Sequence, residues 1–202
     1  MKVVLASKNP HKLVEINQIM APLGVELLLE SDVGVDIEVE ETGTTFEENS
    51  FLKAEAVMKA TGLPALADDS GIAVDALNGE PGVYSARYGG DESLDDWGRL
   101  CLLLKNMENV PDDQRQAQFV SVITLVYPDG HSIQARGEVH GQLLREARGK
   151  GGFGYDPIFY YPPYGCSFGE VPPEKKNAVS HRANALKAFY EKFIKENENA
   201  DK

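Results

Sequence analysis

The residues best suited to chemistry follow a short apolar run, where Ala65-Leu66-Ala67 leads into Asp68, Asp69, Ser70 and Gly71. A run of this length is too short for a helix but suits a buried strand, and the glycine permits a turn or the close approach of a ligand. Neighbouring side chains on a strand point to opposite faces, so only one aspartate faces a given ligand. The pattern predicts a strand that ends in one reactive and one supporting carboxylate; the alternative is a solvated turn.

A second group of acids precedes this strand. Residues 35 to 41 alternate apolar and acidic side chains, which is the period of a half-buried strand, and no Lys or Arg occurs from Ser31 to Leu52. A bound cation would relieve this density of negative charge. We therefore expect Glu40 or Glu41 to be a metal ligand, whereas Asp36 and Glu38 fit a solvated face.

A basic segment, Ser7-Lys8-Asn9-Pro10-His11-Lys12, joins a predicted strand (2 to 6) to a predicted helix (10 to 23). Asn9 suits the N-cap and Pro10 the first helical position. The free amides and the dipole at such a helix start favour an anion. The segment predicts a phosphate-facing helix start, with an ordinary strand-to-helix junction as the alternative.

A further cation lies on the helix predicted from residue 45 to about residue 60. Thr45-Phe46-Glu47-Glu48 matches a capping box. Asn49 and Lys53 are four residues apart and therefore share one helical face. Lys53, a lone cation among acids, is either an ion-pair partner or a phosphate ligand.

Residues 149 to 159 combine glycines with aromatic side chains. Within GKGGFGYDPIF, the glycines permit the close approach of a ligand, and Phe153 or Tyr155 offers a flat face on which a base can stack. Gly154 and Asp156 belong to the same segment. A loose glycine loop is the alternative, which the flanking aromatic residues and Asp156 disfavour.

The last helix follows Lys175-Lys176-Asn177-Ala178-Val179, and Ser180 is suited to cap it. His181 and Arg182 then occupy the helix start, where cations meet free amides. Arg182 is either a surface residue or a ligand-binding residue whose planar guanidinium group donates hydrogen bonds to a keto oxygen or a phosphate.

Other elements complete the scaffold. Residues 25 to 29 form a predicted strand, and residues 117 to 127 and 132 to 139 form two strands joined by the turn Pro128-Asp129-Gly130. Residues 94 to 107 predict an amphipathic helix that buries Trp97, Leu100, Cys101 and Leu104.

Composition limits the possible classes of protein. A chain of 202 residues fits one domain, expected over residues 1 to 196 with a polar tail from 197 to 202. A net charge of −12 argues against a nucleic acid polymer as partner, because such binding requires many Lys and Arg contacts to phosphate. No apolar run is long enough to span a membrane, and residues 1 to 5 read as a strand rather than a signal peptide. The two cysteines form no metal-type pair, which fits a cytoplasmic location.

Six motifs in order resemble the family of non-canonical purine nucleoside triphosphate pyrophosphatases, the inosine/xanthosine triphosphatases. They are SKNPHK (7 to 12), EETG (40 to 43), ENSFLKA (48 to 54), ADDSG (67 to 71), GGFGYDPIF (151 to 159) and SHR (180 to 182). The resemblance spans nearly the whole chain. It implies an elongated α/β domain with a central mixed, twisted sheet flanked by helices, an active-site cleft between two lobes, and a homodimer. It also implies Mg²⁺-dependent cleavage of ITP, dITP or XTP to the monophosphate and pyrophosphate.

The resemblance also implies roles for individual residues. Ser7 to Lys12 and Lys53 would bind the triphosphate, Glu40 and Asp69 the Mg²⁺, and Asp69 would accept the proton of the attacking water. Ser70 would lie beside the substrate. The base and sugar would be surrounded by Phe153, Gly154, Tyr155, Asp156, Lys176, His181 and Arg182. The chain departs from the family pattern at Lys8 and Pro10, where glycine and a small residue are frequent.

Two other functions are alternatives. A Maf-type pyrophosphatase acts on modified pyrimidine triphosphates, but its motifs are not found in this sequence. A non-enzymatic purine nucleotide sensor would not require a base placed at a metal, so Asp69, Glu40 and Lys12 argue against it.

Overall fold

The computed structural model describes residues 1–7, 10–90 and 93–200, without the side chains of residues 10, 11, 15, 18, 19, 199 and 200. The chain forms two compact units. Unit 1 comprises Met1–Asp69, Ser121–Gly137 and Asn184–Lys202, and unit 2 comprises Ser70–Val120 and Glu138–Ala183. The single domain over residues 1 to 196 stays a prediction, and helix α5 (His181–Ala200) continues through most of the segment expected to be a polar tail.

The strands form one mixed sheet in the order β2-β1-β3-β4-β5-β6-β7. β1 (Lys2–Leu5) is parallel to both β2 (Glu26–Leu29) and β3 (Ala65–Val74). β6 (Phe159–Tyr161) is antiparallel to β5 (Ser132–Leu143) and to β7 (Cys166–Ser167). The expected α/β class with a central mixed sheet flanked by helices is therefore confirmed.

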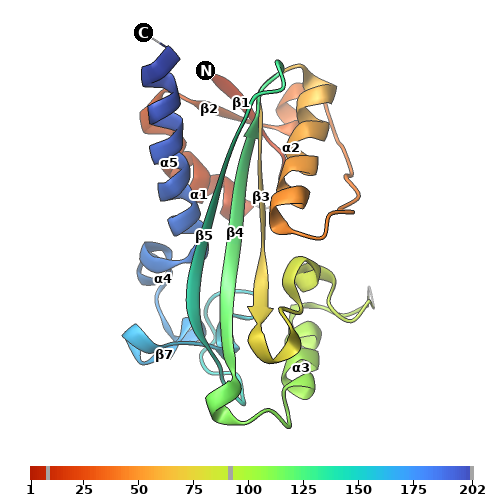
Figure 1. Ribbon diagram of the computed structural model, residues 1–202, viewed down its shortest axis with the longest axis vertical. Helices are drawn as coiled ribbons and strands as arrows, with labels where there is room; N and C mark the ends of the chain where they lie inside the picture. Colours follow the sequence, from red (N-terminus) through yellow and green to blue (C-terminus); the bar gives the residue numbers. More distant parts are fainter. Residues whose placement is uncertain (8–9, 91–92, 201–202) are drawn as a thin grey trace. The chain divides into compact units, whose positions relative to one another are not determined.

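Alternating side chains of the unit 1 strands are buried on two opposite faces. Val3 and Leu5 pack with α1 (Pro10–Met20) and α5, whereas Val4 and Ala6 pack with α2 (Phe46–Thr61). Figure 1 shows α2 on one side of the sheet and α1 and α5 on the other. Because both faces are covered, β1 and the start of β3 are almost entirely apolar.

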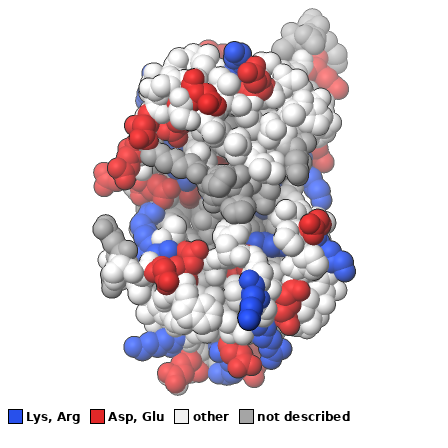
Figure 2. All heavy atoms as spheres, turned by 180° about the vertical axis from the view of Figure 1, so that it is seen from behind, with Lys and Arg blue, Asp and Glu red and all other residues white. Residues whose placement is uncertain are grey.

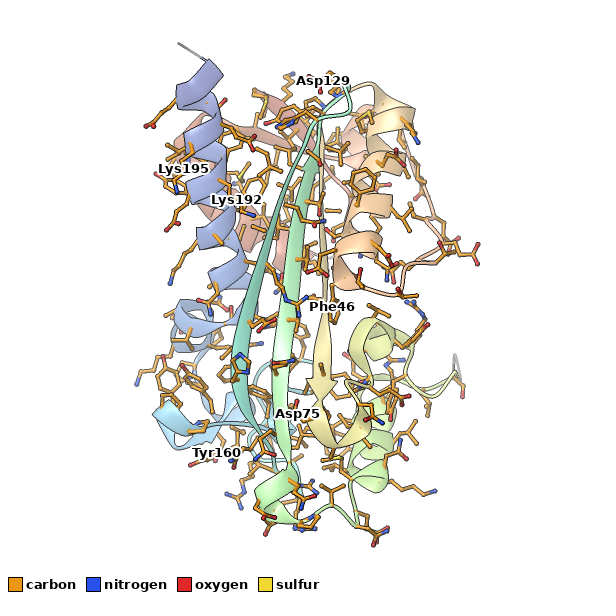
Figure 3. The ribbon with its side chains drawn as sticks, in the orientation of Figure 1. Phe46, Asp75, Asp129, Tyr160, Lys192 and Lys195 are labelled. Carbon is orange, nitrogen blue, oxygen red and sulfur yellow. The ribbon has the colours of Figure 1, made fainter. Side chains whose placement is uncertain are left out.

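The predicted hairpin between β4 (Gln116–Val126) and β5 is confirmed. The Tyr127 amide donates to the His131 carbonyl, and the His131 amide donates to the Asp129 carboxylate. On α5, Lys192 Nζ donates to the carbonyl of Gln134 on β5 over 2.6 Å. Figure 3 shows Lys192 on α5 and Asp129 at the hairpin turn.

Unit 2 is built around aromatic rings. The ring centroid of Phe159 lies 4.6 Å from that of Phe119 and 5.1 Å from that of Phe168. Helix α3 (Asp96–Asn106) buries Leu100 and Leu103 against this core. The short helix α4 (Pro173–Val179) precedes α5.

The predicted burial of Trp97 and Cys101 is wrong. The helix begins at Asp96, with Asp95 as its N-cap, and its buried positions are Leu100 and Leu103. Trp97 is 59% exposed, and Cys101 is also exposed. The buried stripe is therefore rotated away from the face that the apolar pattern indicated.

The predictions for two acid-rich segments also differ from the structure. β3 does not end at the acids but continues through Asp68 and Asp69 to Val74. Residues 35 to 41 alternate between half-buried and exposed, as expected, yet have no regular secondary structure. Side chains rather than a strand ladder hold this segment, as described below.

The surface charges follow the acidic composition. On the face drawn in Figure 2, Lys and Arg side chains are scattered among Asp and Glu rather than gathered in one band. Within the described ranges, no helix has the length and apolar character that crossing a membrane requires.

Candidate active site

Asp68 and Asp69 have different surroundings, as expected for neighbours on a strand. Asp68 Oδ1 accepts a hydrogen bond from Ser121 Oγ on β4 at 2.6 Å, and Asp68 Oδ2 lies 2.9 Å from Lys12 Nζ. The Asp68 carboxylate is fully buried. It is therefore held by its own partners, and it fixes the ammonium group of Lys12.

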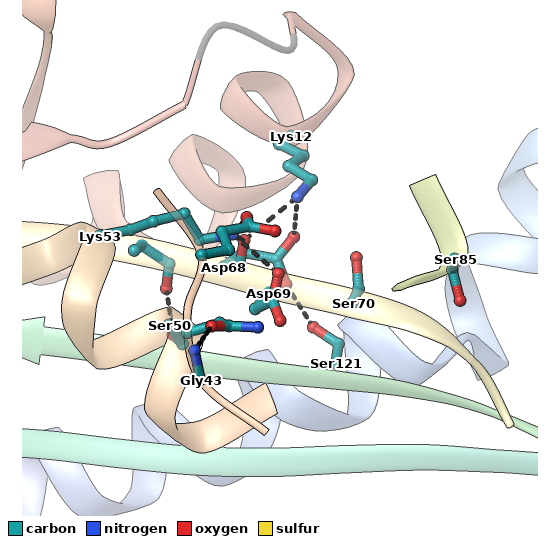
Figure 4. A network of polar contacts seen from close by, with 12 residues as sticks. Lys12, Gly43, Ser50, Lys53, Asp68, Asp69, Ser70, Ser85 and Ser121 are labelled. Carbon is teal, nitrogen blue, oxygen red and sulfur yellow. Dashed lines mark hydrogen bonds and ion pairs between the residues drawn. The ribbon is translucent and has the colours of Figure 1, made fainter. Parts of the chain in front are cut away.

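Asp69 is paired with Lys53. Lys53 Nζ lies 2.8 Å from Asp69 Oδ1 and 2.9 Å from Glu41 Oε1, and it also donates to the Asp68 carbonyl. Figure 4 shows this network around β3. One ammonium group thus joins two carboxylates, which come from the irregular segment and from β3.

Burial sets the ionisation of this group. Burial raises the pKa of Asp69, an effect that the charge of Lys53 partly offsets and that of Glu41 reinforces. Burial lowers the pKa of Lys53, but Asp69 and Glu41 outweigh it, so this pKa is raised overall. A carboxylate with a raised pKa is better suited to accept a proton than an exposed aspartate.

Glu40 and Glu41, the two alternative metal ligands predicted next to each other in sequence, have different surroundings in the structure. Glu40 is exposed, whereas the neighbouring Glu41 joins the network with Asp69. Within the described part of the chain, no group of three or more His, Cys, Asp or Glu is arranged to hold a metal. Two carboxylates, from Glu41 and Asp69, converge on Lys53, and a donor set of this kind fits a hard divalent cation that takes few protein ligands.

A cavity of about 300 Å³ in unit 1 brings the two lysines together. Lys12 and Lys53 line it beside Ser7 and Asp68. Lys8 and Asn9 lie outside the described residues, and Pro10 and His11 are described only as the start of α1. The cavity therefore contains two lysines beside the acids Glu30, Glu38 and Asp68, in the part of the chain that the sequence linked to phosphate.

Unit 2 contains a smaller cavity of about 140 Å³, which the base-binding candidates line. Its lining comprises Ser70, Gly71, Ser85, Ala86, Asp96, Phe119, Phe153, Gly154, Tyr155, Asp156, His181 and Arg182. The Phe153 side chain is 47% exposed, and the His181 ring stacks on Phe119 with centroids 5.0 Å apart. Arg182 is buried, and its Nη2 lies 3.4 Å from Ser70 Oγ. The lining offers flat rings together with a guanidinium donor.

Asp156 organises the glycine-rich loop. Its Oδ2 accepts from the Phe153 amide at 2.8 Å and from Lys176 Nζ at 2.5 Å. Lys176 Nζ also lies 4.5 Å from the centroid of the Phe153 ring. Burial raises the pKa of Asp156, which the charge of Lys176 partly offsets. Gly152 has φ +72°, and a Cβ there would lie 2.2 Å from Asp156 Oδ2, so glycine is required.

Tyr155 has a structural role and does not offer an open face on which a base can stack. Its side chain is buried, and its hydroxyl donates to the Ser85 carbonyl at 2.8 Å. Ser85 Oγ in turn donates to the Gly82 carbonyl and accepts from the Ile72 amide. Gly71 allows this packing, since a Cβ at that position would lie 2.4 Å from Ser85 Oγ.

Several polar residues near the site were not predicted. Ser121 holds Asp68, and buried Glu30 accepts from the Ile37 amide at 3.1 Å. Asn49 Oδ1 accepts from the Gly43 amide at 2.8 Å. These partners are up to 53 positions apart in sequence, so no local pattern indicates them. Only Asn49, which shares a helical face with Lys53, carried a usable signal.

Comparison with known proteins gives consistent matches. The family model of the Ham1 family matches residues 3–192. The chain is 52% identical to a dITP/XTP pyrophosphatase of Thermus thermophilus over 193 residues, which cover 96% of this chain and 92% of that protein. It is 47% identical to that of Escherichia coli over 188 residues, which cover 92% and 94%.

Solved structures agree with these sequence matches. A HAM1 protein from Coxiella burnetii has a TM-score of 0.91 at 40% identity, over 96% of this chain and 99% of that one. A dITP/XTP pyrophosphatase from Mycobacterium abscessus has a TM-score of 0.80 at 46% identity, over 93% and 98%.

Proposed function

The chain belongs to the Ham1 family, and we propose that it hydrolyses non-canonical purine nucleoside triphosphates (ITP, dITP and XTP) to the monophosphate and pyrophosphate. The observation that supports this proposal most directly is that adjacent residues of the sequence belong to the two candidate sites. Asp69 belongs to the lysine and carboxylate network of unit 1, and the next residue, Ser70, lines the cavity of unit 2. One strand, β3, thus carries both the candidate base and a residue beside the candidate purine site.

The unit 2 cavity has the chemistry to read a purine. The exposed Phe153 ring supplies a stacking surface, which contributes about 1 to 3 kcal/mol per base. Hypoxanthine and xanthine carry a keto oxygen at C6, to which Arg182 donates in this proposal. Adenine carries an amine at that position and would set donor against donor. A site built on hydrogen bonds discriminates by as much as about 10⁴ to 10⁵ when its groups are left unpaired.

The lysines of unit 1 are suited to a triphosphate. Lys12 is fixed by Asp68 and Lys53 by Asp69 and Glu41, so both ammonium groups are already positioned before ligand arrives. Preorganised cations lose little freedom on binding. Residues 7 to 12, at the start of α1, would complete this site, as the sequence predicted.

In the proposed reaction, Asp69 accepts a proton from water, whose oxygen attacks phosphorus as pyrophosphate leaves. We propose Mg²⁺ as the cofactor, held by Asp69 together with Glu41 or the sequence-predicted Glu40; when bound, it would neutralise charge on the phosphate oxygens. Lys53 keeps the Asp69 carboxylate oriented, and the buried position of Asp69 raises its affinity for the proton. These residues support hydrolysis over a mere sensor function, and nothing favours the Maf-type alternative.

We extend the proposal to a cytoplasmic homodimer that binds neither a nucleic acid polymer nor a membrane. The homodimer is proposed from the family resemblance, and Tyr84 and Trp97, which are both exposed on unit 2, are candidate contact residues. Light scattering tests the dimer. A pyrophosphate-release assay with and without Mg²⁺, across inosine, deoxyinosine, xanthosine, adenosine, guanosine and pyrimidine triphosphates, tests the function.

A further inference from the structure

Asn49 is a buried polar residue that the mechanism above leaves unused. It lies on the first turns of α2, and its side chain is fully buried. Its oxygen Oδ1 accepts from the Gly43 amide, which can only donate. This bond fixes the orientation of the amide group, so Nδ2 is the end that points away from Gly43.

The contact with Gly43 is also tight. A Cβ on Gly43 would lie 2.6 Å from Asn49 Oδ1 and 2.6 Å from Glu48 Cβ. Only glycine permits this approach, and the hydrogen bond from the Gly43 amide restrains the buried Asn49 side chain. The Nδ2 donor is therefore held in one direction.

Two buried polar atoms remain unsatisfied in this region. Within the described residues, neither Asn49 Nδ2 nor Asp69 Oδ2 has a hydrogen-bond partner. One is a donor and the other an acceptor. Buried polar atoms are almost always satisfied, and a buried water typically makes about 3 hydrogen bonds to such groups.

Helical spacing relates Asn49 to Lys53, the residue that contacts Asp69. Asn49 lies one turn before Lys53 on the same face of α2, and Lys53 Nζ contacts the other oxygen of the Asp69 carboxylate. Ser50 Oγ donates to the Ala67 carbonyl at 3.2 Å, which fixes this end of α2 against β3. Asn49 thus lies on the helical face whose Lys53 contacts Asp69.

We propose that Asn49 Nδ2 donates to the oxygen of the attacking water while Asp69 Oδ2 accepts a proton from the same water. This inference rests on the proposed function. The water proton passes to Asp69, the water oxygen bonds to the α-phosphorus, and the bond from this phosphorus to the bridging oxygen breaks. Pyrophosphate leaves with that electron pair. One lone pair of the water oxygen accepts the hydrogen bond from Asn49, which leaves the other lone pair free to attack the phosphorus.

Two substitutions separate this role from a purely structural one. Asn49→Asp keeps an oxygen for the Gly43 amide but removes the donor, whereas Asn49→Ala removes both without adding charge. Misplacing a reacting group by 1 Å can cost about 100-fold in rate. We expect kcat for dITP to fall about 100-fold in both variants, with KM and the Kd of a non-hydrolysable triphosphate analogue changed less than about threefold.

Ser50→Ala is the matched control, because it removes a buried hydrogen bond of the same helix turn that points to a backbone carbonyl. Its kcat should stay near that of the wild type although its Tm falls. Wild-type kcat in Asn49→Asp together with a loss in Asn49→Ala would overturn the proposal and leave Asn49 as the anchor of Gly43. Parallel losses of kcat and affinity would overturn it too.

Two further measurements cover the cases that the variants alone do not decide. If Asn49→Ala does not fold, a crystal structure of the wild type showing ordered waters decides, since a protein atom bound to Asn49 Nδ2 contradicts the proposal and a water shared with Asp69 supports it. If the wild type releases no pyrophosphate from dITP, ITP or XTP, the proposed function fails, whatever the variants do.

Discussion

Lys53 Nζ lies 2.8 Å from Asp69 Oδ1, so a helix side chain sets the position of a buried carboxylate on the adjoining strand. The same ammonium group reaches Glu41 in the segment before α2. Removing it would leave two carboxylates without their shared cation. The consequences for ligand binding can be measured separately from those for the fold.

Lys53→Ala should weaken binding of a triphosphate more than binding of the monophosphate, because the lysine faces the cavity assigned to the phosphates. Lys59→Ala is the control, since Lys59 lies on the same helix and is 65% exposed beside Glu55. Exposed pairs of this kind contribute about 0.3 to 0.5 kcal/mol. Calorimetry with both ligands gives the answer, and equal losses for the two would make Lys53 a structural ion-pair residue only.

Much of this arrangement follows from local sequence patterns. The capping box at Thr45 and Glu48 predicts the start of α2, and the structure has both of its hydrogen bonds. The spacing of Asn49 and Lys53 then places both side chains on one face. Local periodicity and capping chemistry are sufficient here because helix starts are governed by residues within one turn.

Other features depend on contacts that the sequence does not reveal. Trp97 is exposed although it matches an apolar stripe, because the tertiary contacts of α3 bury Leu100 and Leu103 instead. The segment from 35 to 41 has strand periodicity but is held by Glu30 instead of by a strand partner. Such side-chain partners are distant along the chain, and only the fold brings them together.

Ser121→Ala should lower the free energy of unfolding by about 1.5 to 3 kcal/mol, because Ser121 donates to the buried Asp68 carboxylate, which pairs with Lys12. Ser50→Ala, which removes a neutral hydrogen bond, should cost only about 0.5 to 1.5 kcal/mol. Urea unfolding of both variants provides the comparison. Equal costs would argue that the Asp68 carboxylate does not depend on Ser121.

Arg182→Ala should lower kcat/KM for inosine triphosphate, since a hydrogen bond to a charged group contributes about 1.5 to 3 kcal/mol, while adenosine triphosphate is affected little or improves. Arg145→Ala is the control, because Arg145 is 53% exposed and pairs with Asp112. The ratio of kcat/KM for the two triphosphates is the measurement. An unchanged ratio with both values reduced would mean that Arg182 binds phosphate or has a structural role. Recognition of the base would then be due to Lys176, His181 or the loop from 153 to 156.

His131 offers a pH-dependent contact far from these residues in sequence. Its Nε2 lies 2.8 Å from Glu196 Oε2, and this hydrogen bond, with the nearby charge of Asp129, raises the pKa of His131. A raised pKa means that the stabilising contribution is complete below the unfolded value of about 6.5 and is lost as the pH rises through the folded pKa. NMR titration should give a raised pKa that returns toward about 6.5 in Glu196→Gln. The same pKa in both proteins would rule out the contact in solution.

The most direct measurement of the central claim is pyrophosphate release from dITP by the wild type and by Asp69→Asn, with the fold of each checked by thermal unfolding. The wild type should convert dITP to the monophosphate and pyrophosphate and act far more slowly on deoxyadenosine triphosphate. The folded Asp69→Asn variant should retain its affinity for a triphosphate analogue but lose turnover by about 10² to 10⁴. Wild-type-like turnover in a folded Asp69→Asn variant would contradict the assignment of Asp69 as the proton acceptor, and a wild type inactive on every non-canonical purine triphosphate would contradict the account as a whole.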